Sequence, residues 1–171
     1  MNKPKISIIA ALSDNRVIGQ NNSIPWHLRD DLIRLKKLTV GHAVILGKKT
    51  YESMLSYYKK SGKNTLSLRT HIVITRDSSY LVDKENGFAV NSIEEALVLA
   101  KKIEKKEIFV LGGEQIFKQF LPFTDRLYLT IVHMQISGDA FFPDYSDFKK
   151  ITAKDDFKGE EFDYTFLTLE R

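Results

Sequence analysis

Apolar runs alternate along this chain with segments of helical periodicity. The runs are short and rich in β-branched and aromatic residues, which predicts strands. They lie at Lys5–Leu12, Ala43–Leu46, His71–Thr75, Phe88–Val90, Glu107–Leu111, Arg126–His133, Lys150–Asp156 and Tyr164–Glu170. Apolar residues at helical spacing predict four helices, at Leu28–Thr39, Lys49–Leu55, Ile93–Lys102 and Glu114–Phe120.

Local signals support the ends of these helices. Ser92 with Glu95 three residues later forms a capping box at the start of the third helix. Gly41 fits the end of the first helix. The run Tyr57–Lys60 follows the second helix, and we expect it to be a solvated loop.

The order of the elements predicts the fold class. Strands separated by helices indicate βαβ crossovers and a largely parallel sheet. The run Ile108–Leu111 is apolar on both faces, as a sheet covered on both sides requires. From Arg126 onward strands follow strands. We therefore expect one α/β domain over residues 1–171, with a mostly parallel, doubly wound mixed sheet and an antiparallel C-terminal edge.

Composition narrows the class of protein. The 171 residues are 43% hydrophobic and 28% charged, which is typical of a globular domain. The absence of cysteine excludes disulfides and thiolate metal sites, and we expect no metal. We find neither an apolar run of about 18 residues nor a signal-peptide layout, so we expect a cytoplasmic protein without a membrane segment.

The charge balance favours an anionic partner. The formal net charge is +4 and the pI is near 9.1. The lysines are scattered, however, and form no strong basic stripe. A small polyanionic ligand therefore explains the charge as well as a nucleic acid does.

One acid lies on the apolar face of the first predicted helix. Leu28, Asp31, Leu32 and Leu35 are separated by three, four and seven residues, so they share one face. A carboxylate in an apolar wall has a raised pKa and can handle a proton near neutral pH. The neighbouring Asp30 is expected only to stabilise the helix dipole.

Three strand ends carry groups that suit an anion. They are Gly47-Lys48-Lys49-Thr50, Leu111-Gly112-Gly113-Glu114 and Thr75-Arg76. The first two open helices, whose free N–H groups favour phosphate, although ordinary tight turns explain each motif alone. Ligands in open α/β sheets bind at the carboxyl ends of strands, so the combination indicates a site. Thr130, in mid-strand, needs a partner, either a ligand or a neighbouring carbonyl.

The remaining candidates favour structural roles. His27, His42, His71 and His133 show no ligand spacing, and we expect surface or loop positions for them. Trp26 is expected to contribute to packing.

Taken in order, these motifs resemble those of the bacterial dihydrofolate reductase family. The resemblance covers nearly the whole chain. It rests on Ile9-Ala10-Ala11, Arg16-Val17-Ile18-Gly19, Pro25-Trp26-His27-Leu28, Asp31, Gly47 to Thr50, Gly112-Gly113, Thr130, Gly138-Asp139 and Phe142-Pro143. It implies NADPH-dependent reduction of 7,8-dihydrofolate to 5,6,7,8-tetrahydrofolate by hydride transfer, with acid-assisted protonation of the pterin. It also implies binding of antifolate inhibitors, and a monomer without nucleic-acid or membrane partners.

The resemblance implies a role for each matching substrate position. Asp31 would bind the pteridine and support its protonation, and Thr130 would bond Asp31 and the pteridine amino group. Arg69 would pair with the glutamate tail, with Lys63 as a possible substitute. The pterin and benzoyl pocket would be walled by Ile9, Ala11, Leu32, Leu35, Met54, Leu66 and Leu111.

The resemblance likewise implies a cofactor track and a lid. The nicotinamide and diphosphate would lie along Ala11, Ile18, Gly19, Leu111, Gly112, Gly113, Glu114, Gln115, Ile116 and Phe117. The phosphates would be held by Gly47, Lys48, Lys49, Thr50, Thr75 and Arg76. The loop from Ser13 to Leu28, with Asn22, Ile24 and Trp26, would cover the nicotinamide, supported by Asp139. Family members also carry a cis peptide at Gly112-Gly113.

The chain departs from the family pattern in places. The segment Leu55–Arg69 is longer than usual and free of proline, and Leu35 stands where phenylalanine is common. Lys48 replaces an arginine, and Glu114 replaces a small residue.

Two other functions remain open at this point. One is the related pyrimidine reductase of riboflavin synthesis, and the other is a non-enzymatic binder of anions or nucleic acid. The acid on the leucine face and the Pro25-Trp26 loop favour the dihydrofolate reductase resemblance over the first.

Overall fold

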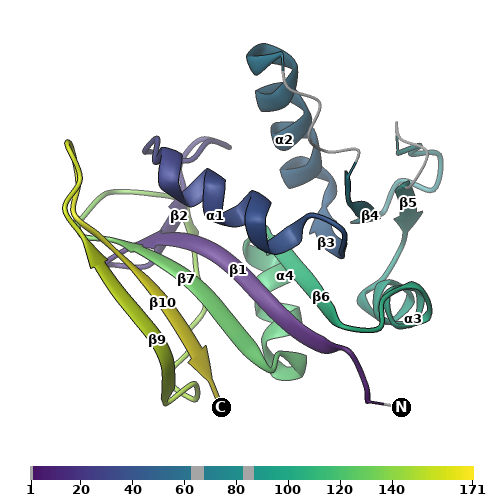
Figure 1. Cartoon of the computed structure of the whole chain (residues 1–171). Coiled ribbons are helices and arrows are strands. Elements are labelled where there is room, and N and C mark those ends of the chain that lie inside the picture. The colour runs from purple at the N-terminus through teal and green to yellow at the C-terminus, as the bar shows by residue number, and fades with distance from the viewer. Residues whose placement is uncertain (1, 63–67, 83–86) are drawn as a thin grey trace.

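The fold is built on one eight-stranded sheet, seen in a computed structural model that describes residues 2–62, 68–82 and 87–171 (Figure 1). The strand order is β5-β4-β3-β6-β1-β7-β10-β9. The strands are β1 (Lys5–Ser13), β3 (Ala43–Gly47), β4 (Thr70–Ile74), β5 (Gly87–Val90), β6 (Glu107–Gly112), β7 (Arg126–Val132), β9 (Lys150–Phe157) and β10 (Tyr164–Glu170).

Helices cover both faces of this sheet. Side chains of α1 (Arg29–Thr39) and α2 (Lys48–Ser61) pack with Ile9, Val44 and Phe109 on one face. Side chains of α3 (Ile93–Ile103) and α4 (Glu114–Phe120) pack with Ile8 and Ile108 on the other. In Figure 1, α1 and α2 lie in front of the sheet and α4 lies behind it.

The predicted mixture of strand directions is confirmed. Neighbouring strands from β5 to β7 run parallel, whereas β10 pairs antiparallel with both β7 and β9. The strand β6 is buried on both faces, as its apolar sequence indicated. The capping box is also present, since the Glu95 backbone N–H donates to the Ser92 hydroxyl over 3.1 Å.

The structure corrects several element predictions. Helix α2 extends to Ser61, so Tyr57–Lys60 is helical and not a loop, because no glycine or proline interrupts the chain before Gly62. A small second sheet of β2 (Val17–Gly19) and β8 (Ala140–Phe141) was not predicted, because strands this short carry no periodicity. A short 3-10 helix, Leu121–Phe123, was also missed.

The prediction of a surface or loop position is wrong for His71. It lies in β4 with 0% of its surface exposed, and its ring centroid is 5.5 Å from that of Tyr51. His42 is only half-buried and contacts Glu104. Trp26, at 9% exposed, packs as expected.

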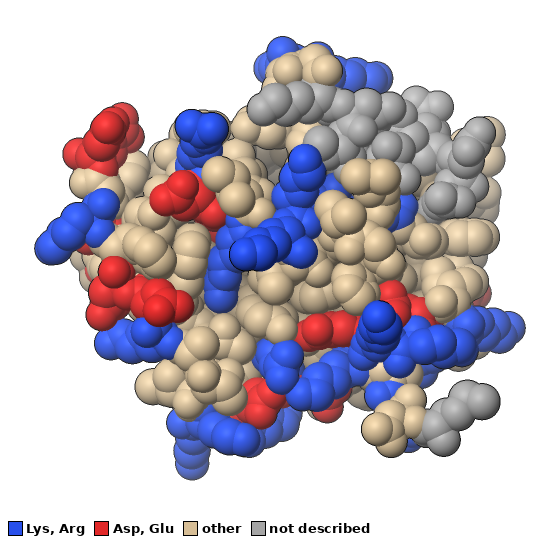
Figure 2. All heavy atoms as spheres, in the orientation of Figure 1, with Lys and Arg blue, Asp and Glu red and all other residues tan. Residues whose placement is uncertain are grey.

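Charged side chains are mixed over the surface. Figure 2 shows lysine and arginine interspersed with aspartate and glutamate on the face that carries α1 and α2. In the described part of that face, no continuous basic stripe is seen. Among the described residues, none of the helices is both long and apolar enough to cross a lipid bilayer.

Candidate active site

Asp31 lies in the first turn of α1, facing the sheet. The Thr130 hydroxyl, from the middle of β7, donates a hydrogen bond to Asp31 Oδ1 over 2.6 Å. Thr130 is 1% exposed, whereas Asp31 retains partial exposure. The strand register places Thr130 beside Ala11, near the carboxyl end of β1. The predicted acid and hydroxyl are therefore in direct contact.

Burial raises the pKa of the Asp31 carboxyl above its ordinary value. The hydrogen bond from Thr130 and the positive charge of Arg34 both act to lower it, but their combined effect is smaller. This carboxyl therefore holds a proton at a higher pH than an exposed aspartate does. Such a group can take part in proton transfer close to neutral pH.

Apolar side chains surround this position. Leu35, Met54 and Leu111 pack against the core cluster that contains Ile9, on the α1–α2 face of the sheet. Ala11 and Leu32 are half-buried. Most of the predicted pocket wall is thus brought together, while Leu66 lies outside the described residues.

Arg69 is almost fully enclosed, at 2% exposed. Its Nε donates to the Thr39 hydroxyl over 2.6 Å, and Tyr58 also forms a hydrogen bond with it. Thr39 ends α1, so the guanidinium is anchored beside the helix that carries Asp31. Lys63, the alternative to Arg69, lies outside the described residues.

The two predicted glycine turns lie side by side. Strands β3 and β6 are parallel neighbours, with Leu46 opposite Gly112. Gly112 has a φ of +107°, and a Cβ there would lie 2.8 Å from the Phe117 ring. A Cβ on Gly113 would lie 3.4 Å from the Thr50 hydroxyl. The Phe117 ring and the Thr50 hydroxyl therefore pack closely against the glycine backbone, and at Gly112 both the positive φ and the Phe117 ring disfavour a side chain. The Gly112-Gly113 peptide is cis, as the resemblance implied.

Helices α2 and α4 begin at these turns without side-chain caps. Gly47 and Gly113 occupy the N-cap positions, and neither helix start receives a side-chain hydrogen bond. Their first N–H groups are therefore available to an anion. Gln115 is exposed on α4, whereas the side chains of Ile116 and Phe117 are buried in the core.

The predicted phosphate-binding charges are mostly at the surface. Lys48 Nζ lies 3.5 Å from the Asp77 carboxylate and 4.5 Å from the ring centre of Tyr80. Arg76 is exposed, and Thr75 accepts a hydrogen bond from the Asp77 backbone N–H. A phosphate at the predicted position would therefore compete with Asp77 for Lys48.

Glu114 does not place a free anion at the glycine turn. Its carboxylate pairs with Lys118 one turn further along α4, over 3.0 Å. The departure from the family pattern at this position is thus compensated within the helix.

The proposed lid is tied to the loop that contains Asp139. The Asn21 backbone N–H donates to the Asp139 carboxylate over 3.0 Å, and the Asp139 N–H donates to the Gly19 carbonyl over 3.1 Å. Ile24 is 60% exposed, whereas Trp26 is buried. The proposed lid is therefore attached to the Asp139 loop at Gly19 and Asn21 and is exposed at Ile24.

A hollow of about 510 Å³ separates the lid from α2. Asn22 borders it on the lid side, and Lys49, Ser53 and Tyr57 border it on the helix side. It therefore lies between the lid and the helix that starts at one glycine turn. Asp31 does not line it.

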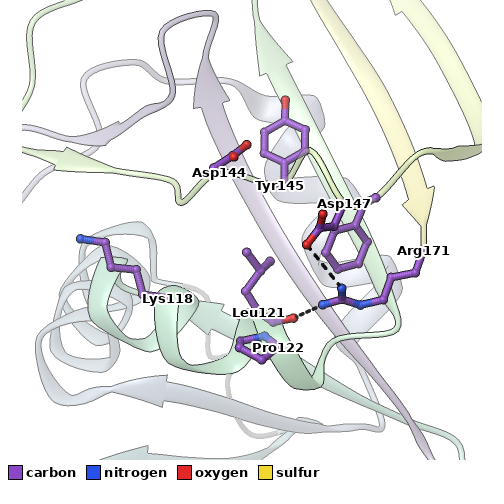
Figure 3. Close-up of a pocket in the computed structure, with 8 residues that line it drawn as sticks. Lys118, Leu121, Pro122, Asp144, Tyr145, Asp147 and Arg171 are labelled. Atoms are coloured by element: carbon purple, nitrogen blue, oxygen red, sulfur yellow. Dashed lines mark hydrogen bonds and ion pairs between the residues drawn. The ribbon is translucent and has the colours of Figure 1, made fainter.

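A second hollow, of about 300 Å³, contains none of the predicted residues (Figure 3). Arg171 crosses its edge, donating to the Leu121 carbonyl over 2.7 Å and lying 4.0 Å from Asp147. Its guanidinium also stacks on Phe148. These contacts attach Arg171 to the rest of the fold, so we assign this hollow a structural role.

Two contacts beside Asp31 were not predicted from the sequence. Arg34, one turn after Asp31, donates to the Leu129 carbonyl over 2.9 Å and contacts the Thr130 hydroxyl at 3.4 Å. The charge pattern gave no hint that an arginine would point toward the sheet. Asp30 accepts a hydrogen bond from the Tyr164 hydroxyl, so it also ties α1 to β10. The described residues contain no group of three metal-ligating side chains.

The comparisons agree with this geometry. Residues 5–171 match the family model for dihydrofolate reductase. The chain is 37% identical to the dihydrofolate reductase of Staphylococcus haemolyticus, over 98% of this chain and 96% of that one. It is 37% identical to the Bacillus subtilis (strain 168) enzyme, over 97% and 94%. The structure of dihydrofolate reductase from Enterococcus faecalis complexed with NADP(H) and RAB-propyl matches with a TM-score of 0.82 and 30% identity, over 98% of this chain and 96% of that one.

Proposed function

This chain belongs to the dihydrofolate reductase family, and we propose that it reduces 7,8-dihydrofolate at the site built around Asp31. It is an NADPH-dependent oxidoreductase that forms 5,6,7,8-tetrahydrofolate. The observation that carries the site assignment is the Asp31 carboxyl, held by Thr130 among apolar side chains, with a raised pKa.

Asp31 has two tasks in this proposal. Its carboxylate binds the amino group of the pteridine, together with the Thr130 hydroxyl. Its raised pKa keeps a proton on the carboxyl at higher pH than on an ordinary aspartate, and that proton reaches the pterin ring nitrogen through water. The wall of Ile9, Leu35 and Leu111 excludes bulk water, which strengthens the electrostatic interactions inside.

The residues at the strand ends fit the cofactor. The uncapped starts of α2 and α4 offer N–H groups, and Lys48 and Arg76 offer positive charge. When bound, NADPH supplies the hydride. The protein positions the reacting groups and excludes water.

The substrate tail is assigned to Arg69. Its guanidinium is fixed by Thr39 and faces Tyr58, on the extended part of α2. An arginine held in this way presents a planar fork that matches a carboxylate. The Tyr58 hydroxyl therefore has to share or release Arg69 when the glutamate tail binds.

We also propose that the chain acts as one domain over residues 1–171 and as a cytoplasmic monomer. The single eight-stranded sheet supports the assignment of one domain. Antifolates would occupy the same cleft, and neither nucleic acid nor membrane is a partner.

The direct test is oxidation of NADPH, followed at 340 nm, in the presence of 7,8-dihydrofolate. We expect dihydrofolate-dependent loss of absorbance that an antifolate blocks. A riboflavin-pathway reductase would instead oxidise NADPH with its own pyrimidine substrate. An anion binder would show neither reaction.

The cofactor assignment has its own test. Replacing Lys48 and Arg76 together with alanine is expected to weaken NADPH binding by about ten- to a hundredfold and to leave NADH binding nearly unchanged, since only NADPH carries the extra phosphate. The control is the double variant Lys101→Ala/Lys102→Ala on α3, which makes the same charge change elsewhere. Equal losses for both cofactors would contradict the assignment.

A further inference from the structure

Arg34 lies directly behind the reacting carboxylate, on the same helix. The helix α1 carries Asp31 in its first turn and Arg34 three residues later, so both side chains face the sheet. The guanidinium is half-buried. An arginine here is unusual in physical terms, because a positive charge beside an apolar pocket needs specific support.

That support comes from two neighbouring strands, β7 and β10. Arg34 Nη1 donates to the Leu129 carbonyl over 2.9 Å, and Nη2 lies 3.5 Å from the Thr168 hydroxyl. The guanidinium carbon lies 4.5 Å from the ring centre of Phe166 and 5.8 Å from that of Tyr128. A guanidinium that is hydrogen-bonded and stacked in this way has a fixed position.

Arg34 reaches Asp31 through Thr130. Its Nη1 lies 3.4 Å from the Thr130 hydroxyl oxygen, and that hydroxyl donates to Asp31 Oδ1 over 2.6 Å. The ion pairs of the described residues do not include Arg34 with Asp31, so the two charges are not in direct contact. The link is therefore one hydroxyl plus an electrostatic interaction.

The chemistry of this link has a direction. Arginine has only donors, so the Thr130 oxygen must accept from Arg34. Within the described part of the chain, the one acceptor for the Thr130 hydroxyl is Asp31 Oδ1. Oδ1 is thus held as an acceptor, and a proton that Asp31 takes up belongs on Oδ2.

We propose that Arg34 is a positioning residue for the reaction, holding Thr130 and setting both the charge and the proton position of the Asp31 carboxyl. The inference rests on the proposed function for its role in turnover. It also states a property of the free protein, namely that removal of Arg34 makes Asp31 easier to protonate.

The charged groups around Arg34 agree with this direction. Asp31 on α1, Tyr128 on β7 and Asp155 on β9 face the guanidinium, and their electrostatic interactions with it all favour its charged form. Burial acts in the opposite sense and lowers the pKa of Arg34, yet an arginine keeps its charge throughout the working pH range. The positive charge of Arg34 therefore acts on Asp31 at every working pH.

The test compares three variants. Arg34→Met removes the charge and keeps the length, Arg34→Lys keeps the charge and loses the planar fork, and Asp155→Asn removes one anion that faces Arg34. In the protein without ligands, ¹³C NMR of the aspartate carboxyls follows the titration of Asp31. We expect a higher midpoint in Arg34→Met, a midpoint near wild type in Arg34→Lys, and a slightly lower one in Asp155→Asn.

The same variants change the pH profile of hydride transfer. Above the wild-type midpoint, Arg34→Met is expected to transfer hydride about three to ten times faster relative to its own low-pH plateau, since one pKa unit is a tenfold change in protonated fraction. A residue that only fastened α1 to the sheet would lower the plateau and leave the midpoint unchanged.

Three results would overturn the proposal. One is an unchanged Asp31 titration in Arg34→Met, and another is an equal shift in Arg34→Lys, which would indicate packing instead of charge. The third is the same shift of the rate profile in an Asp31→Asn background, which would place the effect on the substrate directly. If Arg34→Met does not fold, Asp155→Asn decides, since it leaves Arg34 in place. The NMR titration needs neither substrate nor cofactor, so its outcome is independent of the proposed function.

Discussion

The pKa values of two enclosed carboxyl groups, Asp31 and Glu104, are shifted in opposite directions. Asp31 lies in the first turn of α1 beside Thr130, and Glu104 lies at the C-cap of α3, between the starts of β3 and β6. Glu104 is 9% exposed. Burial raises the pKa of both carboxyls, yet the pKa of Glu104 is lowered overall and that of Asp31 is raised.

The difference lies in the donors that face each group. Glu104 accepts from the backbone N–H groups of Ala43, Lys105 and Lys106 at 3.2, 2.8 and 2.8 Å, and it also pairs with His42 at 3.1 Å. Among residues 2–62, 68–82 and 87–171, Thr130 alone donates a hydrogen bond to the Asp31 carboxyl. Donors to the charged form outweigh burial when there are several of them. A carboxylate with few donors can still take up and release a proton. One with many donors stays ionised and connects neighbouring elements of the fold.

Replacing Asp31 with asparagine tests the reactive side of this comparison and carries the largest expected effect. We expect Asp31→Asn to slow hydride transfer by about 10²–10⁴-fold, as is typical for the loss of one acid–base group. Single-turnover measurements at pH 7 would show it. Asp30→Asn, one residue away and bonded to Tyr164, is the control and should keep most of the rate. A rate for Asp31→Asn within tenfold of wild type would remove Asp31 from the chemistry.

Replacing Glu104 with glutamine tests the structural side. The amide would retain one acceptor and set an NH₂ donor against backbone N–H groups, so we expect a loss of about 2–3 kcal/mol in the free energy of unfolding. Hydride transfer in the folded protein should stay within about twofold of wild type, an extent too small to reflect a lost acid–base group. Urea unfolding and single-turnover kinetics on the same samples separate the two effects. The comparison fails if Glu104→Gln loses rate without losing stability.

The dependence of stability on pH should have opposite signs at the two sites. The lowered pKa of Glu104 means that its charged form stabilises the fold, so the gap between wild type and Glu104→Gln is full above the ordinary carboxyl pKa. That gap shrinks as pH falls through the lowered pKa. The raised pKa of Asp31 means that its ionisation destabilises the fold. The free energy of unfolding of Asp31→Asn should therefore increase relative to that of wild type as pH rises. Urea titrations between about pH 3 and 8 cover both windows, and parallel curves would contradict this account.

These two sites also show how much the sequence can predict. Asp31 was identified because its helical spacing from Leu28, Leu32 and Leu35 is a local signal. The order of strands and helices was predictable for the same reason, since periodicity is local. Glu104 and Arg34 were not identified, because their partners lie on other elements and are fixed only by the packing of the whole sheet.

The errors have the same physical origin. His71 was expected at the surface, but it lies in β4, the second strand from one edge of the sheet, where its neighbours in space decide its burial. The length of α2 was underestimated because aromatic and lysine residues are compatible with either a loop or a helix. Arg69, by contrast, was placed by counting back from β4, and its contact with Thr39 puts it beside α1. Its role at the glutamate tail stays a prediction.

The smallest expected effect on stability concerns His42, a side chain that contacts the Glu104 carboxylate. His42 Nδ1 lies 3.1 Å from the Glu104 carboxylate, and its ring also packs edge-on against Phe109, with centroids 5.3 Å apart. Three backbone donors remain when His42 is replaced, so Glu104 stays charged. We expect a coupling energy of about 1 kcal/mol between His42→Ala and Glu104→Gln in a double-mutant cycle at pH 7.

The cycle matters because His42→Ala alone also removes the contact with Phe109. His42→Phe keeps an aromatic ring there and is the matched control. The decrease in its free energy of unfolding therefore reports the lost hydrogen bond alone. If both histidine variants cost as much as Glu104→Gln, the side chain and not the backbone would hold the carboxylate. Glu104 would then depend on a single titratable partner, and the contrast with Asp31 could no longer be attributed to the number of fixed donors.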